Sequence, residues 1–180
     1  IQYVNYAKIN GTIFYKRVCI PVYENGKLIG MEGRSFNGGK PKVLYPKSTT
    51  VNTLFGVDKL DYSEPVYVVE GITDLGSLFQ AGYRNITALF GANLTNKQKD
   101  MLYRIPYLVV IPDGDEAGRA IIEELDKIRD TEFEIVRIND DKDPGDLTPS
   151  EIREAIESRI TANEYFRQKH GVTYTAPLEW

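Results

Sequence analysis

Two apolar stretches that each end in acidic residues constrain this chain more than any other feature. Residues 66–69 (Val-Tyr-Val-Val) fit a strand buried on both faces, and residues 107–112 have the same character. Glu70 follows the first stretch, and Asp113 and Asp115 follow the second. Strands buried on both faces are typical of parallel sheets, which place their ligands at the carboxyl ends of the strands. The pattern therefore predicts an α/β domain with acids gathered at one edge of its sheet.

The predicted acid cluster indicates a metal site. We expect the two strands to be neighbours, so that Glu70, Asp113 and Asp115 share a pocket, and Asp74 falls in the first turn of the helix expected after Gly71. Carboxylates held together repel one another, and Mg²⁺ or Mn²⁺ prefers oxygen ligands. The alternative interpretation of an acid after a strand is a helix cap without further function.

A third acidic segment follows the strand expected at residues 133–138. Residues 139–147 include Asp143 and Asp146, separated by a proline and a glycine. This composition also suits an ordinary turn, but the position at a third strand end favours metal chemistry. Asp74, Asp143 and Asp146 would bind a second ion or position the first.

The first 60 residues are β-rich and basic. Asn10-Gly11 and Asn25-Gly26 are strong hairpin signals between strand-like runs. These residues contain nine Lys and Arg and three acids, a net charge of +6. Because the whole chain has a net charge of −4, the other 120 residues carry −10. Lys40, Lys42 and Lys47 share a loop rich in glycine and proline that presents them to solvent. The division suits a protein that binds phosphate with one part and metal with the other, the alternative being a merely solvated surface.

Composition excludes several classes of function. The single cysteine, Cys19, excludes an internal disulfide and a four-cysteine zinc module. The single histidine, His170, gives no support to a Ser/His or Cys/His catalytic system. No run of 18 apolar residues and no secretory signal is present, so we expect no membrane contact and a cytoplasmic location in a bacterial or phage-infected cell.

Two motifs carry a resemblance to a known family. Glu-Gly-x-x-Asp at 70–74 and Asp-Gly-Asp-x-Ala-Gly-Arg at 113–119 closely resemble the Toprim domain of topoisomerases and primases. Within that superfamily, the chain is most similar to the RNA polymerase domain of DnaG-type DNA primases, in a bacteriophage version, from about residue 17 to about residue 147. The segments 17–22, 30–34 and 41–45 resemble the basic subdomain that precedes Toprim in DnaG. The Asp-Pro-Gly-Asp sequence at 143–146 departs from the family's common Asp-Pro-Asp by an inserted glycine.

The resemblance and the element pattern together predict the fold and its division. We expect an α/β protein with a doubly wound, mainly parallel Toprim sheet, preceded by a small antiparallel β-rich basic subdomain. The basic nucleic-acid-binding subdomain would span residues 1–62 and the Toprim catalytic domain residues 63–147. A C-terminal helical segment and tail would occupy residues 148–180.

The resemblance also implies a function. It implies the catalytic core of a DNA primase, a nucleotidyltransferase that makes short RNA primers on single-stranded DNA, with two or more Mg²⁺ or Mn²⁺ ions and no zinc in this chain. The implied partners are the template, NTPs, the RNA primer and a replicative helicase of the full-length protein. Glu70, Asp113 and Asp115 would be catalytic, these three and Asp74, Asp143 and Asp146 would bind metal, and Arg17, Arg34, Lys42 and Lys47 would contact nucleic acid or nucleotide.

Two other functions fit the same residues. A Toprim nuclease would cleave phosphodiesters with the same acids, although the basic front of the chain favours a primase. A catalytically silent Toprim module would only bind nucleic acid, and the presence of every core acid speaks against it. A topoisomerase is disfavoured because its nucleophilic tyrosine belongs to large additional domains.

Overall fold

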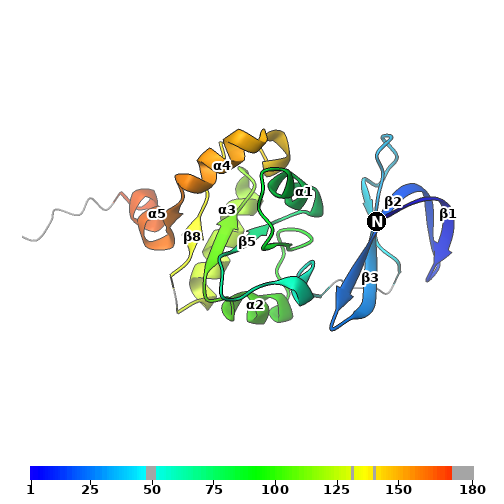
Figure 1. The fold of residues 1–180 in the computed structure, drawn as a ribbon, viewed down its shortest axis with the longest axis horizontal. Coiled ribbons are helices and arrows are strands. Elements are labelled where there is room, and N and C mark those ends of the chain that lie inside the picture. The colour runs from blue at the N-terminus through cyan, green and yellow to red at the C-terminus, as the bar shows by residue number, and fades with distance from the viewer. Residues whose placement is uncertain (48–51, 131, 140, 172–180) are drawn as a thin grey trace, which may run out of the picture.

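The chain forms two sheets of different character. The structure, a computed structural model, describes residues 1–47, 52–130, 132–139 and 141–171. A four-stranded sheet A lies beside a five-stranded sheet B that is covered by helices (Figure 1). Sheet A is antiparallel and sheet B is mainly parallel, as the sequence predicts.

Sheet A is a meander built on the two predicted Asn-Gly turns. Its strands are β1 (Gln2–Ile9), β2 (Thr12–Glu24), β3 (Lys27–Arg34) and β4 (Val43–Leu44), in that spatial order. The central residues of both turns have positive φ, with Asn10 at 47° and Gly11 at 76° in the first. This backbone matches the right-handed twist of the strands that the turn joins.

Sheet B has the order β6-β5-β7-β8-β9. The strands are β5 (Val66–Val69), β6 (Ile86–Ala88), β7 (Leu108–Ile111), β8 (Glu134–Ile135) and β9 (Ile160–Thr161). The first four strands run parallel, and β9 pairs antiparallel with β8. Strand β9 differs from the helix and tail predicted after residue 147, because two residues are too few to give a periodic signal.

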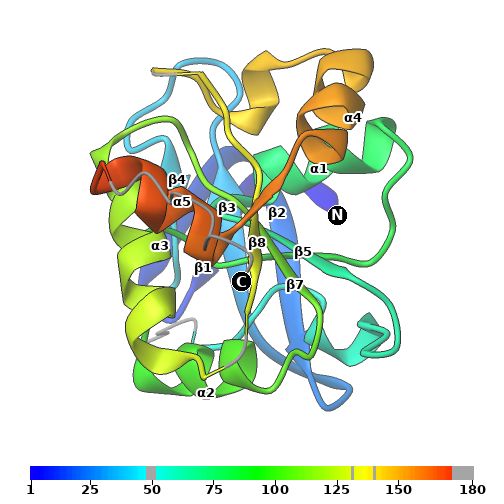
Figure 2. The same ribbon diagram turned by 90° about the vertical axis from the view of Figure 1, so that its left-hand side faces the viewer.

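Helices cover both faces of sheet B, which confirms the doubly wound arrangement. They are α1 (Ile72–Gln80), α2 (Asn96–Tyr103), α3 (Glu116–Ile128), α4 (Pro149–Glu157) and α5 (Ala162–Lys169), with short 3-10 turns η1 (Val57–Lys59) and η2 (Pro144–Asp146). Helices α1 and α4 pack on one face, and α2, α3 and α5 pack on the other (Figure 2). No helix in the described ranges is long and apolar enough to cross a membrane.

The apolar runs of β5 and β7 are continuous because each strand serves two cores. Val66 and Val68 pack into the core under α2 and α3, whereas Val69 packs into the core under α1 and α4. Ile20 of sheet A joins the second core. Sheet A is thereby packed against the same end of sheet B where the acidic residues emerge.

The packing of α3 over the end of β7 depends on Gly118. A Cβ at this position would stand 2.2 Å from the carbonyl oxygen of Asp113 and 2.9 Å from Oε1 of Glu70. We expect Gly118→Ala to lower the free energy of unfolding by about 1–3 kcal/mol, measured by urea denaturation, because the helix must shift away from the strand.

Gly76→Ala is the matched control in α1, since a Cβ there would meet nothing within 4 Å. This control is expected to be neutral or to stabilise the protein by up to about 1 kcal/mol, because alanine favours helix more than glycine does. Equal stabilities of the two variants would contradict the close approach of α3 to β7.

Candidate active site

A cleft of ≈ 340 Å³ separates the carboxyl edge of sheet B from sheet A. The carboxyl edge of sheet B, the loops after it and the start of α1 line the cleft with four acids: Glu70, Asp74, Asp113 and Asp143. The opposite wall, from sheet A and the loop before and after β4, contributes Glu32, Arg34, Lys42 and Tyr45. The cleft therefore has one acidic wall and one basic wall, in which Arg34 and Lys42 outnumber Glu32.

Glu70 and Asp113 are brought together by strand adjacency. Strands β5 and β7 are parallel neighbours, with Val69 opposite Ile111, so both end at the same edge. The backbone N–H of Asp113 donates to Oε1 of Glu70 at 3.1 Å. The prediction that the two acid-bearing strands are neighbours is confirmed.

Asp74 and Asp115 both cap helices, yet both lie near Glu70. Oδ2 of Asp74 accepts from the N–H of Gly71 at 3.0 Å, and Oδ1 of Asp115 accepts from the N–H of Gly118 at 2.9 Å. Asp74 is 5% exposed, whereas Asp115 is exposed and does not line the cleft. Capping fixes each carboxylate in place, and a carboxylate keeps further lone pairs for a ligand.

The carboxylates of Asp143 and Asp146, at the two ends of η2, each accept a hydrogen bond from the backbone N–H of the other residue. The N–H of Asp143 donates to Oδ2 of Asp146 at 3.2 Å, and the N–H of Asp146 donates to Oδ1 of Asp143 at 3.1 Å. A Cβ at Gly145 would lie 2.8 Å from Oδ1 of Asp143 and 3.4 Å from Oδ1 of Asp74, so both carboxylates lie close to this glycine. Asp146 is exposed and outside the cleft.

Backbone hydrogen bonds join the loop after β7, which carries Asp113, to the loop after β8, which carries Asp143. The N–H of Gly114 donates to the carbonyl of Lys142 at 2.8 Å, and the N–H of Asp141 donates to the carbonyl of Gly114 at 3.4 Å. A Cβ at Gly114 would stand 2.3 Å from the carbonyl oxygen of Asn139. Glycine between the two motif aspartates is therefore required for the loops to meet.

The cluster is electrostatically strained without a cation. Burial, followed by repulsion from Glu70 and Asp74, raises the pKa of Asp113 to about 7, and Oδ1 of Asp113 is buried without a hydrogen-bond partner. Burial also raises the pKa of Glu70, and burial together with the charge of Asp143 raises the pKa of Asp74. Ionised acids in this arrangement oppose one another.

The donor set fits a divalent cation, although the side chains do not converge on one point. Within the described ranges, no group of three or more acidic, histidine or cysteine side chains is arranged to hold a metal ion. The oxygen-only donors and the unpaired oxygen of Asp113 nevertheless suit a hard cation such as Mg²⁺ or Mn²⁺.

Glu32 lines the cleft although it is not among the site residues predicted from the sequence. It is 2% exposed and accepts from Nε of Arg34 at 2.5 Å and from the hydroxyl of Tyr45 at 2.7 Å. Burial and the bond to Glu32 raise the pKa of Tyr45. Arg34 also donates to Oγ1 of Thr73 at 3.0 Å, which links sheet A to α1. The available signal was the i, i+2 spacing of Glu32 and Arg34, which puts both on one face of a strand.

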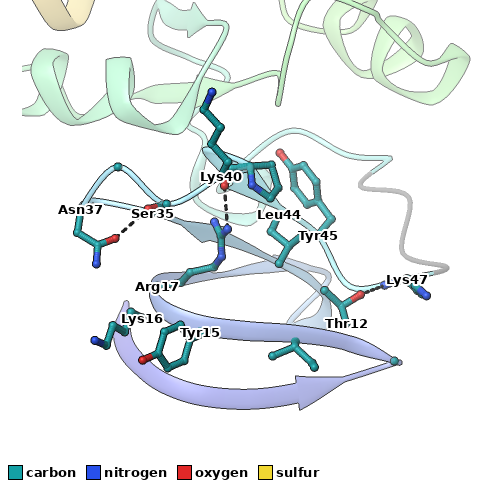
Figure 3. Close-up of a pocket in the computed structure, with 15 residues that line it drawn as sticks. Thr12, Tyr15, Lys16, Arg17, Ser35, Asn37, Lys40, Leu44, Tyr45 and Lys47 are labelled. Carbon is teal, nitrogen blue, oxygen red and sulfur yellow. Dashed lines mark hydrogen bonds between the residues drawn. The ribbon is translucent and has the colours of Figure 1, made fainter.

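The predicted basic residues are placed differently from one another. Arg17, expected to face phosphates, is 5% exposed, and its guanidinium donates to the carbonyls of Gly33, Pro41 and Lys42. These bonds make it a support for the loop before β4, and its predicted contact with nucleic acid or nucleotide stays a prediction. Lys42 is exposed at the cleft, and Lys47 is exposed beside a second groove (Figure 3).

Comparisons with known proteins agree with this arrangement. A family model described as Toprim-like matches residues 67–148. A DNA primase of Clostridium acetobutylicum is 33% identical over 168 residues, which cover 84% of this chain and 28% of that protein. This chain therefore spans less than a third of that relative's length.

Solved structures extend the similarity to sheet A. A DNA primase domain from Pseudomonas aeruginosa has a TM-score of 0.72 and 26% identity, over 91% of this chain and 59% of that one. A DnaG primase catalytic domain bound to single-stranded DNA shares the fold, with a TM-score of 0.69 and 23% identity over 91% of this chain and 59% of that one.

Asp113→Asn tests the strain in the acid cluster. Because folding raises the pKa of this carboxyl from 3.8 to about 7, the stability tied to its neutral form is present at low pH and is lost as the pH rises through 7. In EDTA, we expect Asp113→Asn to raise the free energy of unfolding at pH 8 by about 1–2 kcal/mol and to have little effect at pH 4.

Asp100→Asn, on the exposed side of α2, is the control and is expected to change stability little at either pH. Urea denaturation at both pH values measures the difference. An effect of Asp113→Asn that does not depend on pH would contradict the electrostatic account.

Proposed function

Since this chain is a Toprim-domain homologue of DnaG-type DNA primases, we propose that it is a primase catalytic core that makes short RNA primers from NTPs on a single-stranded DNA template. One observation carries the proposal: acids from three strand ends face a basic wall across a single cleft. Phosphoryl transfer requires positioning and neutralisation of charge more than covalent chemistry, and such a cleft supplies both.

We assign the acidic wall to metal binding. Glu70, Asp113 and Asp115 would hold the first ion, and Asp74, Asp143 and Asp146 would hold a second ion or position the first. Bound Mg²⁺ or Mn²⁺ would neutralise charge on the phosphates at which a 3′-hydroxyl attacks. The protein's own contribution is to keep the acids close through the caps of α1 and α3 and the backbone bonds between their loops.

We assign the basic wall to nucleotide and nucleic acid. Lys42 is exposed and free to meet phosphates, whereas Arg34 reaches the cleft while paired to Glu32. Lys47 would contact the strand further from the acids. The proposed partners are the template, NTPs, the RNA primer and, in a longer protein, a replicative helicase. A bacteriophage source and the division at residues 62 and 147 stay predictions.

The rate at which variants extend a preannealed primer tests how much each acid contributes to catalysis. We expect Glu70→Gln to lower the rate more than about 100-fold, because the change removes charge from the buried centre of the cluster while keeping its shape. Asp146→Asn should cost less than about tenfold and should be partly restored by Mn²⁺, since Asp146 lies outside the cleft. Asp100→Asn serves as the control for a lost surface carboxylate.

The same assay separates the competing functions. A nuclease would degrade the labelled strand in a Glu70-dependent manner, and a silent module would bind it without changing its length. Extension by Glu70→Gln at the wild-type rate would disprove the role assigned to this residue.

Lys42→Gln tests the basic wall. Arg34 is unsuitable because its removal would leave the buried Glu32 with one partner fewer. We expect Lys42→Gln to weaken binding of labelled single-stranded DNA and to reduce the slope of log affinity against log salt by about 0.7, the value for one phosphate contact. Lys27→Gln, at the exposed start of β3, is the control, and equal slopes for the two variants would exclude a phosphate contact by Lys42.

A further inference from the structure

A small pocket of ≈ 170 Å³ adjoins the acidic cleft on the face of sheet B that α3 and α5 cover. The loop after β7 and the α3 residues Arg119 and Ile122 form one part of its lining, and residues 135–138 with Tyr165 of α5 form the rest. Asp113 lines both the pocket and the cleft, so the two hollows meet at this residue. The pocket therefore lies directly beside the acids that are proposed to bind metal.

Two arginines from different elements line this pocket. Nη1 of Arg119, the last residue of the second acidic motif, donates to the carbonyl of Gly114 at 3.2 Å, which holds the guanidinium beside the start of α3. Arg137 follows β8, donates to Oε1 of Gln168 and lies with its guanidinium carbon 5.9 Å from the centre of the Tyr165 ring. Among the described residues, no ion pair includes Arg137. Both ends of the pocket lining therefore carry positive charge.

The electrostatics of the pocket favour an anion. Asp113 is the one acidic side chain among the described residues that line it, and the positive end of α3 begins beside it at Asp115. The charge of Asp113 would be offset by the divalent cation that the acidic wall is proposed to hold. A guanidinium presents a planar fork of N–H donors that matches the oxygens of a phosphate. The lining therefore suits a phosphate-type anion.

The size of the pocket limits that anion. A volume of ≈ 170 Å³ corresponds to about six water molecules at about 30 Å³ each. Pockets that enclose a whole organic ligand measure about 300–1,000 Å³. Ile122 and Ile135 belong to the core beneath the pocket, so its floor is fixed. The pocket is therefore large enough for one or two linked phosphate groups and too small to enclose a nucleotide.

The proposed reaction releases an anion of this kind. Attack of the primer's 3′-hydroxyl on the α-phosphorus of an NTP forms the new P–O bond. The bond between the α-phosphorus and the oxygen that bridges it to the β-phosphorus breaks. Pyrophosphate leaves with that electron pair, and the hydroxyl proton passes to water.

The position of the pocket matches the direction in which this group leaves. The attacking and leaving oxygens of a phosphoryl transfer lie roughly in line, on opposite sides of the phosphorus. Sheet A, which is proposed to hold nucleic acid, lies at one end of the molecule, and α5 lies at the other (Figure 1). The pocket beside α5 is thus on the side of the acids that faces away from sheet A.

We propose that the pocket lined by Arg119 and Arg137 receives the pyrophosphate that primer extension releases. The inference rests on the proposed primase function and deepens it, because it gives the leaving group a place separate from that of nucleic acid. It assigns a role to Arg119, which the acidic wall does not use, and to Arg137, which lies in no motif.

Isothermal titration calorimetry with pyrophosphate in excess Mg²⁺ tests the pocket without turnover. We expect Arg137→Gln to raise the Kd of pyrophosphate at least about tenfold, because a charged hydrogen-bond donor is lost. Arg137→Lys should bind with intermediate affinity, since lysine keeps the charge but lacks the planar fork. Arg104→Gln, at the exposed C-cap of α2, is the control and should bind as the wild type does.

Inhibition of primer extension by pyrophosphate, with free Mg²⁺ held constant, gives a second readout. Arg137→Gln should raise the inhibition constant of pyrophosphate about tenfold and leave the KM for primer–template unchanged. A KM for primer–template that rises as much as the inhibition constant would show that Arg137 contacts nucleic acid, and this result would overturn the proposal.

Failure of the pocket and failure of the proposed function give different results. Equal affinity for pyrophosphate in Arg137→Gln and Arg104→Gln would overturn the pocket even if the chain extends primers. Absence of extension by the wild-type protein would contradict the primase function itself. The two failures are therefore distinguishable.

Discussion

Repulsion among carboxylates at the end of a buried parallel sheet is the constraint on which this structure depends. Glu70 and Asp113 follow neighbouring strands, so the hydrophobic pairing of those strands forces their charges together. Asp74 is held nearby by the cap of α1. The sheet therefore stabilises an arrangement that electrostatics opposes, and burial together with that repulsion raises the pKa of Asp113. A divalent cation would relieve it, and this links the fold to the proposed chemistry.

The basic wall is tied to the acidic wall by a small polar network. Glu32 is buried beneath Arg34 and Tyr45, and Arg34 reaches Thr73 at the start of α1. Removing one member would leave a buried charge with fewer partners, which costs more than the bond itself contributes. The network fixes the width of the cleft, and its Tyr45 forms the border with the neighbouring groove.

Features that depend on local pattern were predictable, and features that depend on tertiary contact were not. Strands β5 and β7 follow from continuous apolar runs, because only strands covered on both faces need them. Their adjacency followed from the acids they carry. The burial of Arg17 was not predictable, because its partners are carbonyl groups distant in sequence. Strand β9 is too short to show a period.

The most direct test of the central claim, that the strand-end acids hold divalent cations, is anomalous diffraction from a crystal soaked in Mn²⁺. The account predicts a peak bound by carboxylate oxygens of Glu70 and Asp113, with any second peak beside Asp74 and Asp143. Small movements of these side chains from their present hydrogen bonds would accompany binding. Manganese bound by Asp143 and Asp146 but not by Glu70, Asp113 or Asp115 would contradict the account.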